Sequence, residues 1–281
     1  MEHDIPLLRP VQVNDPAVRR TLEDAAPDLG VVVAFGQFLG RPIRELPRLG
    51  YLINAHASLL PRYRGASPII QAIVDGESHT GISIMRVERE MDAGAVGLVR
   101  KVEIRNQENG AELTERLSQI AAEAILTALD RITTDEIEWV EQDHSRASLA
   151  PKLLKRDGWL DWTLPTATLI RRIHGLAPRP GAFTQISEPA GSEPTPLRIL
   201  RASEWKHARA QTEPPGTLRR AGDLPNAPSL RVATGDGWLM PMEVQRAGAK
   251  AMSTDDFLRG FPLPDGARLG GDKPQEPTSD A

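Results

Sequence analysis

Asn54 and His56 are the residues of this chain whose types and spacing are best suited to chemistry. They end a short apolar run that is typical of a β-strand, and a turn rich in proline, arginine and glycine follows them. Because side chains alternate between the two faces of a strand, both point to the same face. Open α/β sheets place ligand sites at the C-terminal ends of their strands. The pair therefore predicts a polar site, and a structural histidine is the alternative for His56 taken alone.

A carboxylate, Asp92, completes this candidate site. It follows a predicted strand over 80–87, and loops after neighbouring parallel strands meet at one edge of a sheet. A carboxylate beside an imidazole orients the ring and favours its charged form. An amide and a protonated imidazole together stabilise an oxyanion on a tetrahedral carbon. Asn54, His56 and Asp92 thus predict acyl-type transfer without a covalent nucleophile.

The loop 57–65 supplies backbone polar groups, a rigid Pro61 and two arginines, Arg62 and Arg64. Such loops often hold a flat heterocycle or an anion, and an exposed turn is the alternative for the arginines. Glycine-rich phosphate-binding motifs and the Gly-x-Ser-x-Gly motif of hydrolases are absent. The chain has no cysteine and its histidines lack metal-ligand spacing, so no metal is expected.

The elements that must position these residues alternate as in a βαβ fold up to about residue 138. Residues 29–35 form a continuous apolar run, which predicts a strand buried on both faces as in a parallel sheet. Asn109 and Glu112 resemble a capping box for a helix over 111–132. The other elements predicted in this half are a helix capped by Asp15, helices over 41–46 and 68–74, and strands over 51–56, 80–87 and 97–104.

The second half has a different pattern, with one helix over 164–175 and short strands between proline- and glycine-rich turns. This pattern predicts a small β-barrel or sandwich. The strands are expected near 197–202, 216–219, 229–234 and 237–244. The predicted organisation is a first domain over 1–138, a linker over 139–156, a second domain over 157–262 and a disordered tail over 263–281.

Composition and charge limit the class of protein. Of the 281 residues 40% are hydrophobic, and no apolar run approaches the ~20 residues of a membrane span. The acidic start lacks the features of a signal peptide, so a cytoplasmic location is expected. Residues 151–220 contain 12 basic and 6 acidic residues, a balance of +6, whereas residues 1–150 have a balance of −7. The basic segment suits a polyanion such as nucleic acid, and a solvated surface is the alternative.

Longer motifs carry a family resemblance. The first half contains Val-Val-Val-Ala-Phe-Gly at 31–36, Asn-Ala-His-Ala-Ser-Leu-Leu-Pro-Arg-Tyr-Arg-Gly at 54–65 and Met-Asp-Ala-Gly at 91–94. The second half contains Pro-Gly-Thr-Leu at 215–218 and Ala-Gly-Ala-Lys-Ala-Met-Ser at 247–253. With these motifs the chain resembles the methionyl-tRNA formyltransferases of the folate-dependent formyltransferase family.

The resemblance implies a fold, a reaction and partners. The expected fold class is α/β, a Rossmann-like formyltransferase domain with a parallel sheet, followed by a small OB-like β-barrel that binds tRNA. The reaction implied is transfer of a formyl group from 10-formyltetrahydrofolate to the amino group of methionyl initiator tRNA, for translation initiation. Asn54, His56 and Asp92 match the catalytic positions. The segment that contacts tetrahydrofolate is matched by Ser58, Leu59, Leu60 and Pro61. A monomer is expected.

The chain departs from the family pattern in three places. The N-terminal strand–helix–strand unit of the family is expected to be missing, the stretch before Asn54 has one extra residue, and Ala95 replaces a usual aspartate. Two alternatives remain open. One is another enzyme that transfers or hydrolyses the formyl group of 10-formyltetrahydrofolate. The other is a truncated, catalytically impaired or silent family member that still binds tRNA.

Overall fold

The chain forms two compact units. The computed structural model describes residues 5–187, 194–206, 211–220, 229–263 and 267–271. The first unit comprises Met1–Pro68, Thr80–Glu103 and Arg116–Ala150, and the second comprises Ile69–His79, Ile104–Glu115 and Pro151–Ala281. Within the described residues, no helix has the length and apolar character needed to cross a membrane.

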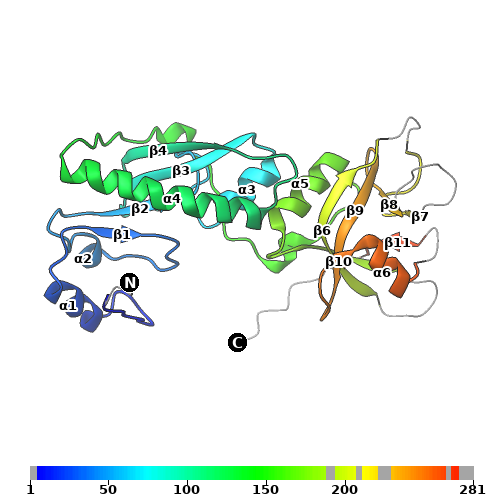
Figure 1. Cartoon of the computed structure of the whole chain (residues 1–281), viewed down its shortest axis with the longest axis horizontal. Helices are drawn as coiled ribbons and strands as arrows, with labels where there is room; N and C mark the ends of the chain where they lie inside the picture. The colour runs from blue at the N-terminus through cyan, green and yellow to red at the C-terminus, as the bar shows by residue number, and fades with distance from the viewer. Residues whose placement is uncertain (1–4, 188–193, 207–210, 221–228, 264–266, 272–281) are drawn as a thin grey trace. The chain divides into compact units, whose positions relative to one another are not determined.

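The first unit is built on a four-stranded sheet with the order β1-β2-β3-β4 (Figure 1). Its strands are β1 (Gly30–Val32), β2 (Leu52–His56), β3 (His79–Arg86) and β4 (Val96–Glu103). β1 and β2 are parallel, but β2 and β3 are antiparallel. The prediction of a parallel sheet is therefore wrong for this part of the sheet, which is mixed. Burial patterns of single strands do not encode the direction of a neighbour, because a strand covered on both faces reads the same either way.

β1 is only partly buried, although its sequence predicts a strand buried on both faces. Val31 is 42% exposed, Gly30 and Val32 are half-buried, and Val33, just after the strand, is 53% exposed. Within the described sheet β1 is an edge strand, paired with β2 alone. Its apolar residues therefore have a neighbouring strand on one side only, which leaves them less covered than residues of a central strand. The predicted absence of an N-terminal strand–helix–strand unit stays a prediction.

Three short helices precede or connect these strands in the sequence, and the third belongs almost wholly to the second unit. They are α1 (Pro16–Asp24), α2 (Arg41–Arg44) and α3 (Pro68–Asp75). The predicted cap of the first is confirmed, since the Asp15 side chain accepts a hydrogen bond from the Ala17 N–H. A small apolar cluster joins Val13, Leu39, Ile43 and Leu52.

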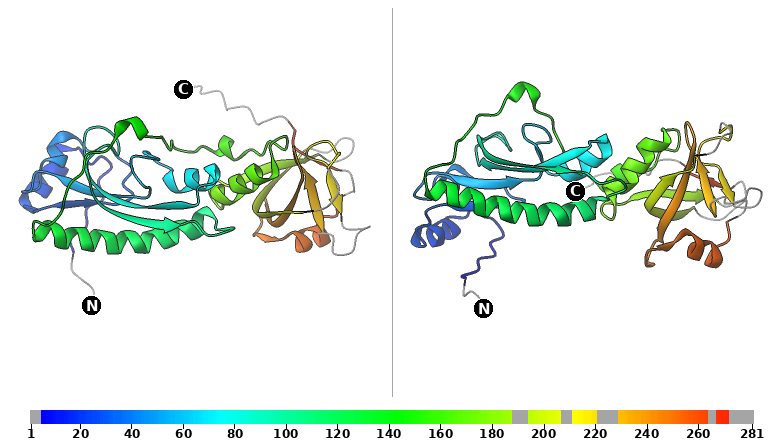
Figure 2. Two further views of the ribbon diagram at one scale, coloured as in Figure 1. Left: turned by 90° about the horizontal axis from the view of Figure 1, so that it is seen from above. Right: turned by 45° about the horizontal axis from the view of Figure 1, so that its top comes forward.

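The long helix α4 (Gly110–Thr133) begins in the second unit and continues through the first. In the first unit it runs along the sheet (Figures 1 and 2). Leu117, Ala124 and Ala128 are almost fully buried, at a spacing that follows one helical face. The predicted capping box is confirmed, because the Asn109 N–H donates to Glu112 and the Glu112 N–H donates to the Asn109 side chain, both at 3.0 Å.

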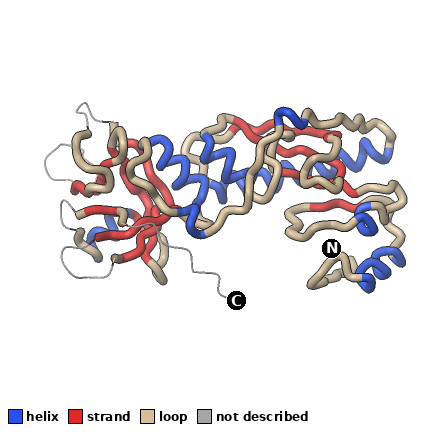
Figure 3. The backbone as a smooth tube through the Cα atoms, turned by 180° about the vertical axis from the view of Figure 1, so that it is seen from behind, coloured by secondary structure: helices blue, strands red, loops and turns tan. Residues whose placement is uncertain are grey.

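The second unit contains an antiparallel sheet with the order β11-β5-β6-β9-β8-β7, and β10 pairs with β9. The strands of this sheet are the red segments on the left of Figure 3. Its strands are β5 (Ala182–Ser187), β6 (Thr195–Glu204), β7 (Leu218–Arg220), β8 (Leu230–Ala233), β9 (Trp238–Arg246), β10 (Met252–Ser253) and β11 (Arg268–Leu269). The helices α5 (Thr166–Leu176) and α6 (Thr254–Gly260) belong to the same unit.

The two ends of this sheet meet, which makes it barrel-like. The Leu269 N–H donates to the Gly216 carbonyl, and the Leu218 N–H donates to the Ala267 carbonyl, both at 2.8 Å. A side chain on Gly216 would lie 2.2 Å from the Leu269 carbonyl oxygen, and its φ is +85°. Only glycine fits there without strain. The core inside the barrel includes Leu197, Val232 and Leu239.

The strands near 197–202, 216–219, 229–234 and 237–244 are present within a few residues of their predicted ends. The sequence does not predict β5, β10 or β11. β11 lies in the stretch 263–281, for which disorder was predicted, so the expected disorder does not hold at Arg268–Leu269. Residues 264–266 and 272–281 of that stretch lie outside the described residues.

Candidate active site

β2 places Asn54 and His56 on one face of the sheet. From Ile53 to His56 the strand pairs with β3 without a register shift, and Asn54 also lies opposite Val32 of β1. The extra residue expected before Asn54 therefore does not disturb the alternation of these side chains. His56 is 6% exposed, whereas Asn54 is half-buried.

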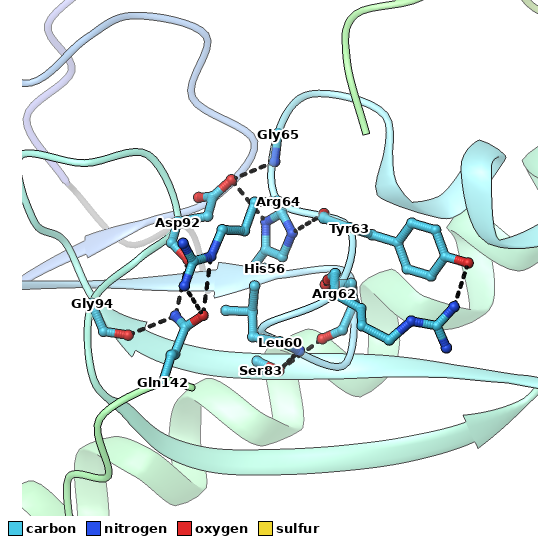
Figure 4. Close-up of polar contacts among 11 residues, drawn as sticks. His56, Leu60, Arg62, Tyr63, Arg64, Gly65, Ser83, Asp92, Gly94 and Gln142 are labelled. Carbon is cyan, nitrogen blue, oxygen red and sulfur yellow. Dashed lines mark hydrogen bonds and ion pairs between the residues drawn. The ribbon is translucent and has the colours of Figure 1, made fainter. Parts of the chain in front are cut away.

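Both ring nitrogens of His56 face oxygen atoms (Figure 4). Nε2 lies 2.9 Å from the carbonyl oxygen of Tyr63. A carbonyl oxygen only accepts, so Nε2 carries the proton and donates. Nδ1 lies 3.6 Å from Oδ2 of Asp92, which is an ion-pair distance and longer than a hydrogen bond. To contact a substrate oxygen, the Nε2 proton has to leave the Tyr63 carbonyl.

Asp92 reaches His56 from the connection between β3 and β4. The expected reason was a shared edge of a parallel sheet, but β3 runs antiparallel to β2, and its last residue, Arg86, lies opposite Ile53 at the start of β2. The connection turns back toward the other end of β2 instead. Asp92 itself has a φ of +52°, and its Oδ2 accepts a hydrogen bond of 2.8 Å from the Gly65 N–H.

The loop after β2 is shaped by serine hydroxyls. Ser58 is fully buried, and its Oγ donates to the Arg62 carbonyl at 2.6 Å. The Ser83 hydroxyl of β3 donates to the Ser58 carbonyl at 2.7 Å and accepts from the Leu60 N–H at 3.2 Å. The Ser58 hydroxyl thus fixes the loop internally. In the predicted segment Ser58–Pro61, the half-buried Leu59, Leu60 and Pro61 are more accessible than Ser58.

Arg64 is only 5% exposed, so the exposed-turn alternative is wrong for it. Its backbone pairs with the segment 148–150, through the Arg64 N–H to the Ser148 carbonyl and the Ala150 N–H to the Arg64 carbonyl. A side chain on Gly65 would lie 2.6 Å from the Ala150 carbonyl oxygen, which explains the glycine after Arg64. Residues 139–150, expected to be part of a linker, thus make ordered contacts with the candidate site.

Comparisons with known proteins show the family to which the chain belongs. The Formyl transferase family matches residues 2–129, and the C-terminal domain of formyl transferases matches residues 152–262. Methionyl-tRNA formyltransferase of Roseiflexus castenholzii is 40% identical over 267 residues, covering 95% of this chain and 81% of the relative. The chain belongs to the methionyl-tRNA formyltransferase family. The enzyme of that name from Geobacter sulfurreducens is 37% identical over 269 residues, covering 96% of this chain and 80% of the relative.

A solved structure shares the fold at lower identity. HypX from Aquifex aeolicus matches with a TM-score of 0.63 and 18% identity, covering 89% of this chain and 42% of that one. A second structure of the same protein, in complex with tetrahydrofolic acid, matches with a TM-score of 0.61 and 18% identity, over 88% of this chain and 42% of that one.

The motifs in the sequence do not single out two buried polar residues near the candidate site, Gln142 and Ser83. Gln142 stands in a polar stretch without periodicity, and Ser83 lies between two isoleucines of β3. Both are buried, with exposed fractions of 7% and 0%. For Ser83 the signal is a hydroxyl within a run of buried residues, which needs a hydrogen-bond partner. For Gln142 no local signal exists, because its partners lie about 50 residues and more away.

Proposed function

We propose that this chain transfers the formyl group of 10-formyltetrahydrofolate to the α-amino group of methionyl initiator tRNA. The observation that carries the proposal is the meeting of His56 and Asp92 beside Asn54, in a chain 40% identical to a methionyl-tRNA formyltransferase. The family membership supports this reaction, and the geometry supports a role for these residues in it.

In this reaction the methionine amine attacks the formyl carbon as a free base. The new bond between the amine nitrogen and the formyl carbon gives a tetrahedral intermediate, whose oxygen carries the negative charge. One proton passes from the amine to N10 of the folate, and the intermediate then collapses by breaking the bond between the carbon and N10. The Asn54 amide and the His56 Nε2 proton stabilise the charged oxygen, once that proton leaves the Tyr63 carbonyl. Asp92 orients the ring from the Nδ1 side and relays protons.

The loop after β2 is the folate segment of this proposal. Leu59, Leu60 and Pro61 are half-buried and follow the catalytic strand directly, so they offer apolar contact and backbone groups to a flat pterin. Ser58 contributes by shaping the loop through its bond to the Arg62 carbonyl. Catalysis by the described residues needs no metal ion, because polarisation of the formyl group comes from N–H donors.

The barrel of the second unit is the tRNA-binding part of the proposal. Small closed barrels of the OB type bind nucleic acids along their strands and loops. The segment 151–220, with its balance of +6, leads into and through this barrel and attracts tRNA phosphates. The protein acts as a monomer in the cytoplasm in this account.

The test is the identity of the formylated product. The purified chain is given 10-formyltetrahydrofolate labelled in the formyl group, together with charged initiator tRNA, free methionine or an amino sugar nucleotide. We expect label on the methionyl-tRNA. Label on the sugar would identify a different formyltransferase, and release of free formate would identify a hydrolase. Bound tRNA without any turnover would support a silent family member, and each of these results contradicts the proposal.

A further inference from the structure

The side-chain amide of Gln142 lies beneath the turn that carries Asp92. Its Nε2 donates to the Asp92 carbonyl at 2.9 Å and to the Gly94 carbonyl at 2.8 Å (Figure 4). Both N–H groups of the amide are therefore used on this turn. Gln142 is 7% exposed, so water competes little for these bonds.

Arg64 fixes the orientation of that amide. Its Nη2 donates to Oε1 of Gln142 at 2.8 Å, and its Nε donates to the same oxygen at 3.2 Å. A guanidinium only donates and a backbone carbonyl only accepts, so the amide fits in one orientation and not in the flipped one. Arg64 thus holds the amide so that both N–H groups of Gln142 point at the turn.

Backbone pairing holds both partners in place. Val140, two residues before Gln142, exchanges two hydrogen bonds with Val96 at the start of β4, at 2.8 and 3.0 Å. The backbone of Arg64 pairs with the segment 148–150. The position of the amide is therefore fixed by backbone pairing outside the turn that carries Asp92.

The turn needs such support because of its backbone conformation. Asp92 is a non-glycine residue with a φ of +52°, a left-handed conformation that costs free energy even for aspartate, which adopts it more readily than most residues. Its carboxylate accepts a hydrogen bond from the Gly65 N–H and lies 3.6 Å from His56. A small shift of the turn changes that distance directly.

We propose that Gln142 is a positioning residue for Asp92, with Arg64 fixing its amide. This inference rests on the proposed function, in which Asp92 orients His56. Gln142 touches neither reacting group, so it acts on turnover through the Asp92 carboxylate. Loss of its two donors loosens the turn, and a misplacement near 1 Å reduces turnover roughly 100-fold.

The kinetic test uses Gln142→Met, which keeps the length of the side chain and removes the donors. We expect kcat to fall roughly 10- to 100-fold, with the KM of both substrates within about twofold of wild type. Gln119→Met, the same change at an exposed position of α4, is the matched control and keeps wild-type kcat. In an Asp92→Ala background, Gln142→Met should change kcat by less than about twofold, because the carboxylate it positions is gone.

A purely structural role predicts other results. Gln142→Met would then lower kcat by the same factor with and without the Asp92 side chain, and this outcome overturns the proposal. If Gln142→Met does not fold, Gln142→Glu serves instead, because its carboxylate still pairs with Arg64 but repels the two carbonyls of the turn. Gln119→Glu is its control.

A second readout does not depend on activity. The ring-nitrogen signals of His56, assigned by their loss in His56→Ala, are recorded by NMR. We expect Asp92→Asn and Gln142→Met to shift the Nδ1 signal in the same direction, and Gln119→Met to leave it in place. An unchanged signal in Gln142→Met overturns the positioning role. A shifted signal in a chain without formyl transfer would instead refute the proposed function and keep the positioning role.

Discussion

The His56–Asp92 pair is assembled by residues far apart in the chain. β2 carries the His56 ring, and the β3–β4 connection carries the Asp92 carboxylate. The Gly65 N–H, in the loop after β2, donates to Oδ2 of Asp92 and so links the two segments. At 3.6 Å the pair interacts electrostatically, and the interaction depends on the charge of Asp92. Removing that charge while keeping the hydrogen bond separates the two contributions.

Asp92→Asn makes this separation. The amide oxygen of asparagine still accepts from the Gly65 N–H, so we expect the free energy of unfolding to stay within about 1 kcal/mol of wild type. Turnover should fall by about 100-fold or more, because the ring loses its charged partner. Single-turnover rates and urea unfolding measure the two effects. Asp130→Asn on the exposed side of α4 is the control, and wild-type turnover in Asp92→Asn would refute a role for the charge.

At the scale of elements, distant residues complete local structures. The first turn of α5 is capped by Asp236, which follows β8. Its Oδ1 accepts from the Thr166 N–H at 2.7 Å and from the Thr166 hydroxyl at 2.9 Å. The backbone hydrogen bond from Thr166 is the main cause that holds the pKa of Asp236 below its usual value. The helix start is thereby tied to the barrel of the same unit.

A pH-dependent contribution to stability follows from this cap. A depressed folded-state pKa means that the stabilisation is present above the unfolded value, about 3.9, and is lost as the pH falls through the folded value. Asp236→Ala should lower the free energy of unfolding by about 1 kcal/mol at pH 7. The difference from wild type should shrink as the pH falls below about 4. Urea unfolding at pH 7 and pH 3 tests this, and an equal difference at both would argue against the cap.

Closure of the barrel depends on Gly216. Gly216→Ala introduces a clash with the Leu269 carbonyl and a strained positive φ. Gly248→Ala is a matched control, since Gly248 has a φ of +74° and a Cβ there would meet nothing within 4 Å. We expect the control to cost about 1 kcal/mol and Gly216→Ala to cost about 2 kcal/mol more. Thermal unfolding measures both, and equal costs would show that closure there is loose.

Sequence periodicity predicted these elements better than their pairing. α4, β3 and β4 were found within one or two residues, because apolar spacing is a local property. The direction of β3 relative to β2 was wrong, since it depends on tertiary contacts. β5 was missed because alternation over six residues beside prolines is a weak signal. The candidate site was recognisable from three residue types, but the buried support by Gln142 was not, because its partners are distant in sequence.

At the scale of the whole molecule, charge is distributed unevenly along the chain. The first 150 residues have a balance of −7 and the segment 151–220 has a balance of +6. This asymmetry favours tRNA phosphates at the segment 151–220 over the first 150 residues. Lys152 is an exposed cation at the start of the basic segment, and Lys101 is an exposed cation of β4 in the acidic half.

The two lysines give a test of that preference. If tRNA follows the basic segment, Lys152→Glu weakens tRNA binding, and the slope of log Kd against log salt falls by about 1. The turnover at saturating tRNA should remain that of wild type. Lys101→Glu, the same charge reversal on β4, should change the slope little. Filter binding over a salt range of roughly 50 to 200 mM measures both; equal effects would place tRNA elsewhere.

The single-turnover rate of His56→Ala against wild type measures whether His56 acts in formyl transfer to methionyl initiator tRNA. His56 is buried and its Nε2 bonds to Tyr63, so the variant should lose about 1–2 kcal/mol of stability and still fold. His79→Ala, an exposed histidine of β3, is the control. We predict formylated tRNA with wild type and the control, and a rate lower by about 1,000-fold with His56→Ala. A near-normal rate in folded His56→Ala would show that His56 takes no part in the transfer.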